Sequence, residues 1–236
     1  MIGDVVGSAG VRALYLCLTQ LRKRYNSDLV IANVENSADG FGLTCSQADE
    51  LASCGIDVMT SGNHIWERRE IWASLESDDR LLRPHNYPSS LPGKGVCIVE
   101  TRGVTIGVLN LQGRSGMMAL DCPFSTARSE VSKLRKITPL IFVDMHAEST
   151  EEKEALALYL DGQVSCVIGT HTHVQTADER ICPSGTGYLT DLGMTGPHDS
   201  VLGMEIETVI SRSLSQMPLR MVVADGPADI CGALIS

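Results

Sequence analysis

The sequence predicts an α/β fold in which two β-sheets pack face to face and helices cover the outer faces. Two observations lead to this prediction. Helix-like and strand-like apolar patterns alternate along the 236 residues, and a β-rich hairpin pattern interrupts the alternation near the middle. The chain has no linker, internal repeat or low-complexity tract, so we expect a single domain over residues 1–236.

The first expected helix follows Gly10, where apolar side chains recur on one helix face. These side chains are Val11, Leu14, Leu18, Leu21 and Tyr25. A strand is expected at 28–33. Thr44 and Gln47 then form a capping box, which predicts a helix that ends near Gly55.

The middle of the chain changes character. A strand at 56–59 and a helix at 66–75 are followed by a Pro-rich stretch at 83–92, which we expect to be an ordered surface loop. Two β-rich runs at 95–100 and 104–112 are separated by a short Thr-Arg-Gly link, which predicts a hairpin. An antiparallel section is thus added to the fold.

The second half returns to alternation. Residues 127–137 are expected to form a helix, and a capping box of Ser149 and Glu152 opens another helix that ends at Leu160. The expected strands of this half lie at 140–145, 164–168, 187–191, 219–223 and 230–235.

The composition is that of an ordinary globular chain, with 43% hydrophobic and 20% charged residues. No run of about 18 apolar residues is present, and the N-terminus lacks the pattern of a signal peptide, so we expect neither a membrane span nor export. The eight cysteines form no C-x-x-C pair, which indicates small buried side chains in a reducing compartment. We therefore expect a cytoplasmic protein.

The net charge of −10 argues against a protein that coats nucleic acids, because such proteins usually carry a basic patch. We expect no stable nucleic-acid complex. A phosphate substrate is compatible with this charge, since bound metal ions supply positive charge locally.

Five strand-like runs end in side chains that bind metals. The run at 164–168 leads into Gly169-Thr170-His171-Thr172-His173, with two imidazoles two positions apart. The other runs lead to Asp4, to Glu35 and Asn36, to Asn63 and His64, and to His146. A single histidine in such a place is more often a hydrogen-bonded loop residue, and a lone His-x-His pair leaves both interpretations open. The five runs together predict a metal centre, because α/β folds bind ligands at the carboxyl ends of strands.

These motifs occur in the order and spacing of the calcineurin-like metallophosphoesterases, and the chain resembles in particular their bacterial YmdB-type branch. The segments that carry the resemblance are Gly3-Asp4-Val5-Val6-Gly7, Glu35-Asn36, Gly62-Asn63-His64, His146-Ala147-Glu148, 169–173, 35–42, 83–88 and 195–200. They span nearly the whole chain. The resemblance implies a four-layer αββα sandwich, a centre of two metal ions and hydrolysis of phosphoesters.

The resemblance also implies which residues bind the ions. One ion is then held by Asp4, Glu35, Asn36 and His173, and the other by Glu35, Asn63, His146 and His171. A shared carboxylate suits two cations about 3.5–4 Å apart, because it reduces their repulsion. Many relatives have a histidine where this chain has Val6, and Asn36 takes its place. Oxygen and imidazole ligands suit two divalent or mixed-valence ions of iron or manganese and tolerate zinc or nickel.

The first strand is short in this sequence. Only three residues precede Asp4, whereas strands usually run about 5–6 residues. Either this strand is unusually short or the natural chain begins a few residues earlier, and the resemblance favours the second interpretation.

The expected reaction is in-line attack on phosphorus by a hydroxide that bridges the two ions, because metal-bound water loses its proton near neutral pH. His64 is the candidate acid that protonates the leaving oxygen, since it adjoins Asn63 and neither ligand set needs it. Its alternative role is to orient a metal ligand.

Four further side chains are weaker candidates. His85 and His198 lie in Pro-containing loops and are candidates for substrate contact, although a loop histidine needs no function. Asp144 and Glu148 flank His146, and we expect strand alternation to place them in different surroundings from that ligand. They are candidates only for orienting it.

Three functions remain open. The leading prediction is a phosphodiesterase that hydrolyses cyclic nucleotides or other small phosphodiesters at a dinuclear metal centre. The alternatives are a phosphomonoesterase acting on nucleotides or phosphoproteins, and a metal-binding regulatory protein with little activity. The complete ligand set together with His64 weighs against the last alternative. Homo-oligomer formation is also open, because relatives self-associate but no heptad or apolar stripe in the sequence requires it.

Overall fold

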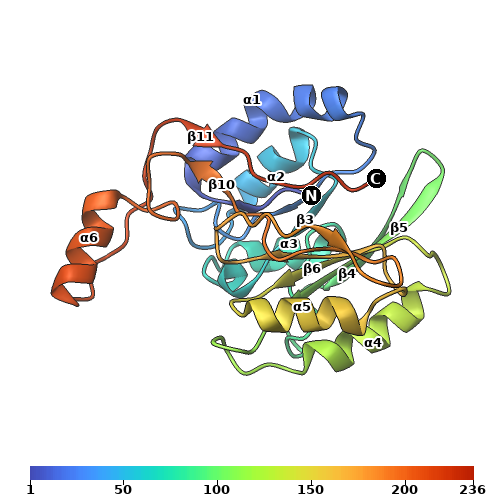
Figure 1. The fold of residues 1–236 in the computed structure, drawn as a ribbon. Coiled ribbons are helices and arrows are strands. Elements are labelled where there is room, and N and C mark those ends of the chain that lie inside the picture. Colours follow the sequence, from blue (N-terminus) through green and yellow to red (C-terminus); the bar gives the residue numbers. More distant parts are fainter.

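The computed structural model describes residues 1–236 and has a mixed α/β architecture (Figure 1). Its strands form sheets of six, three and two strands. None of its helices combines the length and the apolar character needed to span a membrane.

The first half of the chain follows the predicted alternation. The capping box is present, because the Thr44 hydroxyl accepts a hydrogen bond from the Gln47 backbone N–H at 3.2 Å and the Gln47 side chain accepts one from the Thr44 N–H. The elements are β1 Asp4–Val5, α1 Gly7–Tyr25, β2 Ile31–Asn33, α2 Cys45–Ser53, β3 Val58–Thr60, the 3-10 helix η1 Asn63–Trp66, α3 Ile71–Ser77, β4 Val96–Thr101 and β5 Val104–Gln112.

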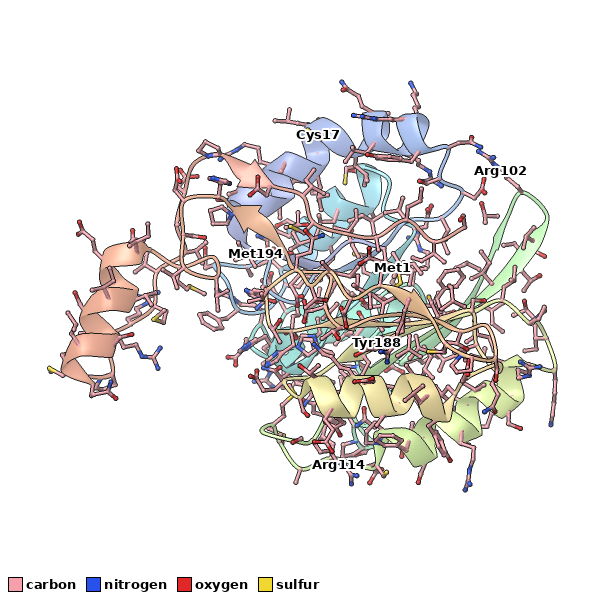
Figure 2. All side chains as sticks on the ribbon, in the orientation of Figure 1. Met1, Cys17, Arg102, Arg114, Tyr188 and Met194 are labelled. Atoms are coloured by element: carbon pink, nitrogen blue, oxygen red, sulfur yellow. The ribbon has the colours of Figure 1, made fainter.

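The predicted hairpin of β4 and β5 is confirmed. Thr101 and Val104 pair at its end, and Arg102 and Gly103 between them have φ values of 48° and 77°. Two residues with positive φ are typical of the tight turns that join antiparallel strands. Arg102 lies at the tip of the hairpin (Figure 2), where its guanidinium pairs with Asp28 at 2.6 Å.

The second half contains three helices and several short strands, and two of the helices, α4 and α5, cover the six-stranded sheet. Its elements are α4 Pro123–Leu134, β6 Ile141–His146, α5 Thr150–Tyr159, β7 Cys166–Thr170, β8 Arg180–Ile181, β9 Gly187–Leu189, β10 Met194–Pro197, α6 Ile206–Ser215 and β11 Ala228–Asp229.

The strands that matter for function run parallel. In the six-stranded sheet, β5, β6 and β7 are parallel neighbours, so that Gln112, His146 and Thr170 lie side by side at their carboxyl ends. In the smaller sheets β1 pairs with β10 and β2 pairs with β3, all parallel. Bridges from Ile2 to Ala32 and from Val6 to Asn36 align the chain around β1 with β2.

The core consists of separate apolar clusters. The largest joins α1, α2 and α3 to the smaller sheets, and its counterpart joins α4 and α5 to the six-stranded sheet. A third cluster contains Ile31 and Val58 from the smaller sheets together with Ile106 and Val108 from the large sheet. The two sheet systems therefore pack against each other.

The C-terminal part differs from the prediction. The expected strand at 219–223 is wrong, because no strand lies beside it and only Val223 forms an isolated bridge, with Met204. The expected strand at 230–235 is also wrong, since only Gly232 bridges to Ile2 and the short strand β11 precedes it. Helix α6 was not predicted, because its serines, threonine and β-branched residues are weak helix formers.

Candidate metal centre

The structure brings together side chains that lie in five strands or directly after them. Asp4 lies in β1, Glu35 and Asn36 follow β2, Asn63 begins η1 after β3, His146 ends β6, and His171 and His173 follow β7. Carboxyl ends of parallel strands meet at one edge of a sheet, so residues far apart in sequence become neighbours.

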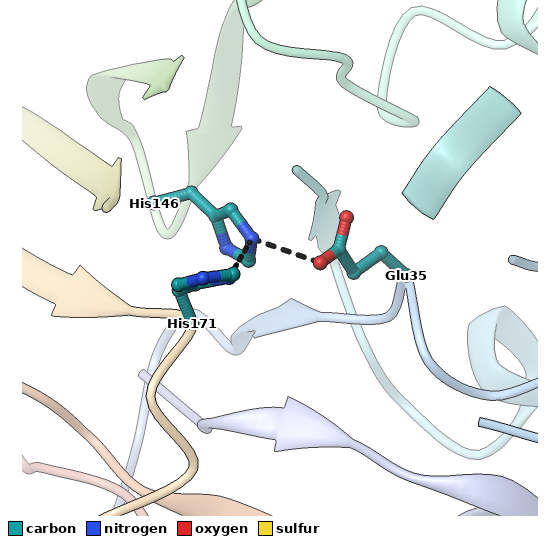
Figure 3. Close-up of side chains that lie close together, drawn as sticks. All are labelled: Glu35, His146 and His171. Carbon is teal, nitrogen blue, oxygen red and sulfur yellow. Dashed lines mark hydrogen bonds and ion pairs between the residues drawn. The ribbon is translucent and has the colours of Figure 1, made fainter. Parts of the chain in front are cut away.

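His146 lies at the centre of this group (Figure 3). Its Nε2 atom is 2.8 Å from Oε1 of Glu35, 3.1 Å from Nδ1 of His171 and 3.2 Å from Oδ1 of Asn63. One ring nitrogen can donate only one hydrogen, so it cannot satisfy three neighbours of this kind. A cation at this position would contact all four groups.

The other ring nitrogen of His146 is bound inside the protein. Its Nδ1 atom is 3.0 Å from the Thr170 hydroxyl, which donates a hydrogen bond to Oδ1 of Asp144 at 2.7 Å. The Thr60 hydroxyl donates to the second oxygen of Asp144. With the Thr170 hydrogen directed to Asp144, the Thr170 oxygen can accept a hydrogen from Nδ1 of His146, and Nδ2 of Asn33 also lies 3.3 Å from this nitrogen. In the neutral ring that carries its hydrogen on Nδ1, the lone pair of Nε2 faces the centre.

The two histidines of the His-x-His motif are oriented in a similar way. The Nε2 atom of His171 is 3.2 Å from a carboxylate oxygen of Glu148, which leaves its Nδ1 toward His146. The Nδ1 atom of His173 is 3.0 Å from the carbonyl oxygen of Leu202. Metal-binding histidines typically donate one ring N–H to such an oxygen and present the other nitrogen to the ion. His146 and His171 match this arrangement beside Glu35, and His173 matches its first part, with one ring nitrogen at a protein oxygen.

Asp4 and Asn36 contribute oxygens without partners. Both side chains are buried, and neither Oδ1 of Asp4 nor Oδ1 of Asn36 has a hydrogen-bond donor. The second oxygen of Asp4 accepts the backbone N–H of His171 at 3.1 Å. Burial raises the pKa of Asp4, although the nearby His173 and His146 oppose this rise. Unpaired buried oxygens are costly unless a cation satisfies them, so these two residues fit a second ion.

The close contacts among His146, Glu35 and His171 shift the pKa values of all three residues. Burial by itself would lower the pKa of His146, but the Glu35 and Asp4 carboxylates raise it to about 9. Burial likewise opposes ionisation of Glu35, but His146 lowers its pKa to about 2. Burial and the positive charge on His146 lower the pKa of His171 to about 3. A proton on His146 thus occupies the position that suits a metal ion.

A buried ion pair holds the His-x-His turn. Lys153 and Asp191 are fully buried, and Nζ of Lys153 is 2.8 Å from Oδ2 of Asp191. The same oxygen accepts the Thr172 N–H at 3.1 Å. The backbone of His171 and His173 has φ values of 102° and 63°, which are uncommon for residues other than glycine. The pair therefore fixes a strained turn that aims both imidazoles.

The three remaining candidate histidines, His64, His85 and His198, lie at different places relative to this centre. The backbone N–H of His64 donates to Oε2 of Glu35 at 2.8 Å, so this residue lies beside the centre, with its ring packed edge-on against Phe41. His85 is instead 3.6 Å from Glu130, and His198 is 2.6 Å from Asp229. No hydrogen bond or ion pair joins His85 or His198 to the residues clustered around His146, and their contact with substrate stays a prediction.

Sequence reasoning missed or misplaced the residues behind the ligands. The expectation that alternation separates Asp144 from His146 is wrong, because residues two apart in a strand share a face. Both are fully buried and are joined through Thr170. That spacing could have identified Asp144. Lys153 and Asp191 left no signal, since Lys153 lies in α5 and Asp191 follows β9, and only the fold brings the two together.

Comparison with known proteins assigns the family. The family described as YmdB-like protein matches residues 1–236. The chain belongs to the YmdB-like family. It is 46% identical over 234 residues to the 2',3'-cyclic-nucleotide 2'-phosphodiesterase of Bacillus subtilis (strain 168), and the match covers 99% of this chain and 89% of that protein.

Two crystal structures are similar to this YmdB-like chain. A hypothetical protein from Thermus thermophilus has a TM-score of 0.91 at 42% identity, over 96% of this chain and 88% of that one. A novel phosphatase from Mycoplasma pneumoniae has a TM-score of 0.90 at 35% identity, over 97% and 83% of the two chains. The resemblance to the YmdB-type metallophosphoesterases that the motifs indicated is confirmed.

Proposed function

We propose that this chain is a dinuclear metal-dependent phosphodiesterase that hydrolyses cyclic nucleotides or other small phosphodiesters. The observation that carries the proposal is the orientation of the three histidines. Each has one ring nitrogen beside an oxygen of the protein, and His146 and His171 present the other nitrogen toward Glu35. Loop histidines without a ligand have no need of such a shared arrangement.

The chain is a phosphoric ester hydrolase, as its relatives with phosphodiesterase and phosphatase names indicate. The Bacillus subtilis relative supports a cyclic nucleotide as the substrate, through its printed name. The Mycoplasma pneumoniae structure, described as a phosphatase, favours the second candidate, a phosphomonoesterase that uses the same site.

The donor set fits two transition-metal ions. Glu35, Asn63, His146 and His171 would hold one ion, and Asp4, Glu35, Asn36 and His173 would hold the other. Oxygen and imidazole donors without a thiolate suit iron or manganese, while zinc and nickel are tolerated. When bound, such a pair supplies a nucleophilic hydroxide at neutral pH and offsets the negative charge of the phosphoryl group.

Residues of the chain would orient the Glu35 carboxylate and protonate the leaving oxygen. The Glu35 carboxylate is fixed by the His64 N–H at 2.8 Å and by His146, so its two oxygens face different partners. The His64 ring is partly exposed, and its buried Nδ1 has no hydrogen-bond partner. A ring held beside the centre without a committed donor is suited to protonate the leaving oxygen.

Activity measurements separate the candidate functions. Purified protein would be stripped of metal, reloaded with iron, manganese, zinc or nickel, and assayed on a 2',3'-cyclic nucleotide and on a nucleoside monophosphate. We expect metal-dependent hydrolysis of the cyclic diester at the higher rate. Faster hydrolysis of the monoester would favour the phosphatase, and binding of two ions without either activity would favour a regulatory protein.

His64→Ala tests the proposed acid. This variant should keep its metal content but hydrolyse a diester with a poor leaving group about 10²–10⁴-fold more slowly, the usual contribution of a positioned acid. A diester with a phenolate leaving group needs little protonation and should slow much less. Equal slowing of both substrates would assign His64 to charge stabilisation or substrate binding, and loss of metal would show that the His64 ring binds an ion or orients a ligand.

Three broader features complete the proposal. The helices and the two packed sheet systems would form a four-layer αββα sandwich, which is supported by apolar clusters at both helix–sheet contacts and between the sheets. Residues 1–236 would form one domain. A cytoplasmic location stays a prediction.

A further inference from the structure

The imidazole of His64 is held by a ring contact and not by a hydrogen bond. Its side chain is 25% exposed, and its Nδ1 atom is buried without a hydrogen-bond partner, so the accessible edge of the ring carries Nε2. The Glu67 carboxylate is 3.7 Å from Nδ1, which is beyond hydrogen-bond distance. The ring of Phe41 packs against the imidazole instead, with centroids 5.0 Å apart and an angle of 73° between the ring planes.

A histidine that acts as an acid has to keep its ring in one orientation. Its donating nitrogen must lie within about 2.6–3.2 Å of the oxygen that it protonates. A ring without a hydrogen bond can turn about its side-chain bonds and carry that nitrogen away. Edge-on contacts between aromatic rings have a preferred geometry, so the Phe41 ring restricts the rotation of the His64 ring.

Phe41 is itself fixed relative to His64. Arg68, four residues after His64, donates from Nη2 to the Ala38 carbonyl at 3.3 Å and from Nε to the Phe41 carbonyl at 3.4 Å. Gly42 has a φ of 87°, and a Cβ atom there would lie 2.7 Å from Cγ of Arg68, so this close approach requires glycine. The Arg68 side chain therefore ties the backbone that carries Phe41 to the backbone that carries His64.

The segment that contains Phe41 holds His64 at two points. Glu35, at the start of the segment, accepts the His64 backbone N–H at 2.8 Å, and Phe41 contacts the ring. The segment is also anchored to α2, because Nε2 of Gln47 donates to the Ser37 carbonyl at 2.8 Å. Phe41 is only half-buried and belongs to none of the apolar clusters of the core. Its ring contact with His64 is therefore not a by-product of core packing.

We propose that Phe41 is a positioning residue for His64, an inference that rests on the proposed role of His64 as the acid. The Phe41 ring selects the orientation in which Nε2 of His64 faces the leaving oxygen of the substrate. Phe41 acts only through His64 and makes no bond in the reaction. Loss of the Phe41 ring should thus resemble a partial loss of the acid, while the metal ligands stay in place.

Steady-state kinetics of the metal-loaded protein test the proposal on two substrates. A 2',3'-cyclic nucleotide has a leaving oxygen that needs a proton, whereas the phenolate of bis(p-nitrophenyl) phosphate leaves without one. Phe41→Leu should lower kcat for the cyclic nucleotide about tenfold, with KM, metal content and phenolate release nearly unchanged. Phe41→Tyr keeps an aromatic ring and should retain most of the rate.

Phe124→Leu is the matched control. It removes a similar edge-on contact, with Tyr159 at 5.6 Å between centroids, on the helices that cover the six-stranded sheet, and should leave the kinetics unchanged. A rise in KM for the cyclic nucleotide without a loss of kcat would show that Phe41 stacks on the nucleobase. Loss of metal from Phe41→Leu would assign Phe41 to support of Glu35. Either result overturns the proposal.

A double variant makes the test specific to His64. In the His64→Ala background, Phe41→Leu should slow the cyclic nucleotide no further, because the ring that Phe41 positions is gone. Losses that multiply would show that Phe41 acts independently of His64 and would overturn the proposal.

The mobility of the His64 ring supplies a readout that does not depend on activity. NMR relaxation of its Cε1 carbon should show a more mobile ring in Phe41→Leu and an unchanged ring in Phe124→Leu. A His64 ring that is as ordered in Phe41→Leu as in wild type overturns the proposal. A mobile ring with full rates on both substrates would instead support the positioning contact and contradict the role of His64 as the acid.

Discussion

The proposed metal ligands around Glu35 form two groups that the protein positions in very different ways. Asn63, His146 and His171, here called the linked group, contact one another at 3.1–3.2 Å around one nitrogen of His146. Asp4, Asn36 and His173, here called the open group, do not contact one another through their side-chain polar atoms. Two of their oxygens lack any hydrogen-bond donor, and Nδ1 of His173 is 3.0 Å from the carbonyl oxygen of Leu202, which precedes α6.

The difference follows from the elements that carry each group. In the linked group His146 ends β6 and His171 directly follows β7, and these two strands are paired in the large sheet. The open group lies on the two-residue strand β1 and on loops. Ligands on rigid, paired strands are positioned more firmly than ligands on loops. We therefore expect the linked group to bind its ion more tightly than the open group does.

The largest effect on metal content and activity is expected from Glu35, the residue that both groups share. Glu35→Gln removes the negative charge between two cations and should remove both ions, with a loss of diester hydrolysis on the order of 10³–10⁵-fold. Elemental analysis and a rate measurement would check this. Glu100→Gln is the control, because Glu100 is exposed on β4 and contacts none of the proposed ligands or His64. Retention of both ions in Glu35→Gln would show that Glu35 is not the bridge.

A pair of variants separates the two groups. His173→Ala should lose the ion of the open group and keep one tightly bound ion, whereas His146→Ala should lose the ion of the linked group and keep one weakly bound ion. Metal titration with a competing chelator, together with anomalous diffraction, would locate the remaining ion in each variant. Equal loss of both ions from either variant would mean that the groups act as one unit.

A smaller effect on metal affinity is expected from the residues that orient the linked group. Thr170→Val removes the hydroxyl that joins His146 to Asp144 and should weaken the tighter ion about 10–100-fold, the usual effect of losing such support. Thr172→Val is the matched control two residues away, because the Thr172 hydroxyl only accepts a hydrogen bond from Val174. Thr170→Ser should restore most of the affinity. A full loss in the serine variant would indicate a packing defect.

The pH dependence of metal affinity should be about tenfold per pH unit. Without metal the pKa of His146 is about 9, because the Glu35 carboxylate outweighs burial. A metal ion must displace that proton, so affinity of the linked group should rise between pH 6.5 and 9 and level off above the pKa of about 9. Chelator competition at several pH values would measure the slope. A flat profile in this window would show that His146 binds the ion without losing a proton.

Much of the fold was predictable, as was the clustering of His146 and His171 with Glu35, because both depend on local patterns. Apolar periodicity placed the helix α1 and the strands β5, β6 and β7, and the Thr44 capping box placed the start of α2. The strand ends that deliver Asp4, Glu35, Asn63, His146 and His171 could be read in the same way. Each signal lies within a few residues of the feature that it predicts.

The failures involve contacts between distant segments. The sequence 219–223 has a strand-like pattern, but strand formation also needs a neighbour, and the fold supplies none there. Helix α6 is unfavourable by propensity and was missed for that reason. Lys153 and Asp191 are 38 residues apart, and only the packing of their elements shows that they form a buried pair. Assigning ligands to two separate ions also required the family resemblance.

The left-handed backbone at His171 and His173 bears on whether the metal-binding imidazoles are positioned before or after an ion binds. Each residue in such a conformation costs on the order of 1–3 kcal/mol, and an unfolded chain would seldom hold both at once. The buried pair of Lys153 and Asp191 stabilises the turn through protein contacts alone, so we expect the turn to be ordered before an ion arrives. An incoming ion then meets imidazoles already in place. The rate of metal uptake should accordingly follow the exchange of water on the ion, with faster uptake for ions that release water quickly, and not a rearrangement of the chain.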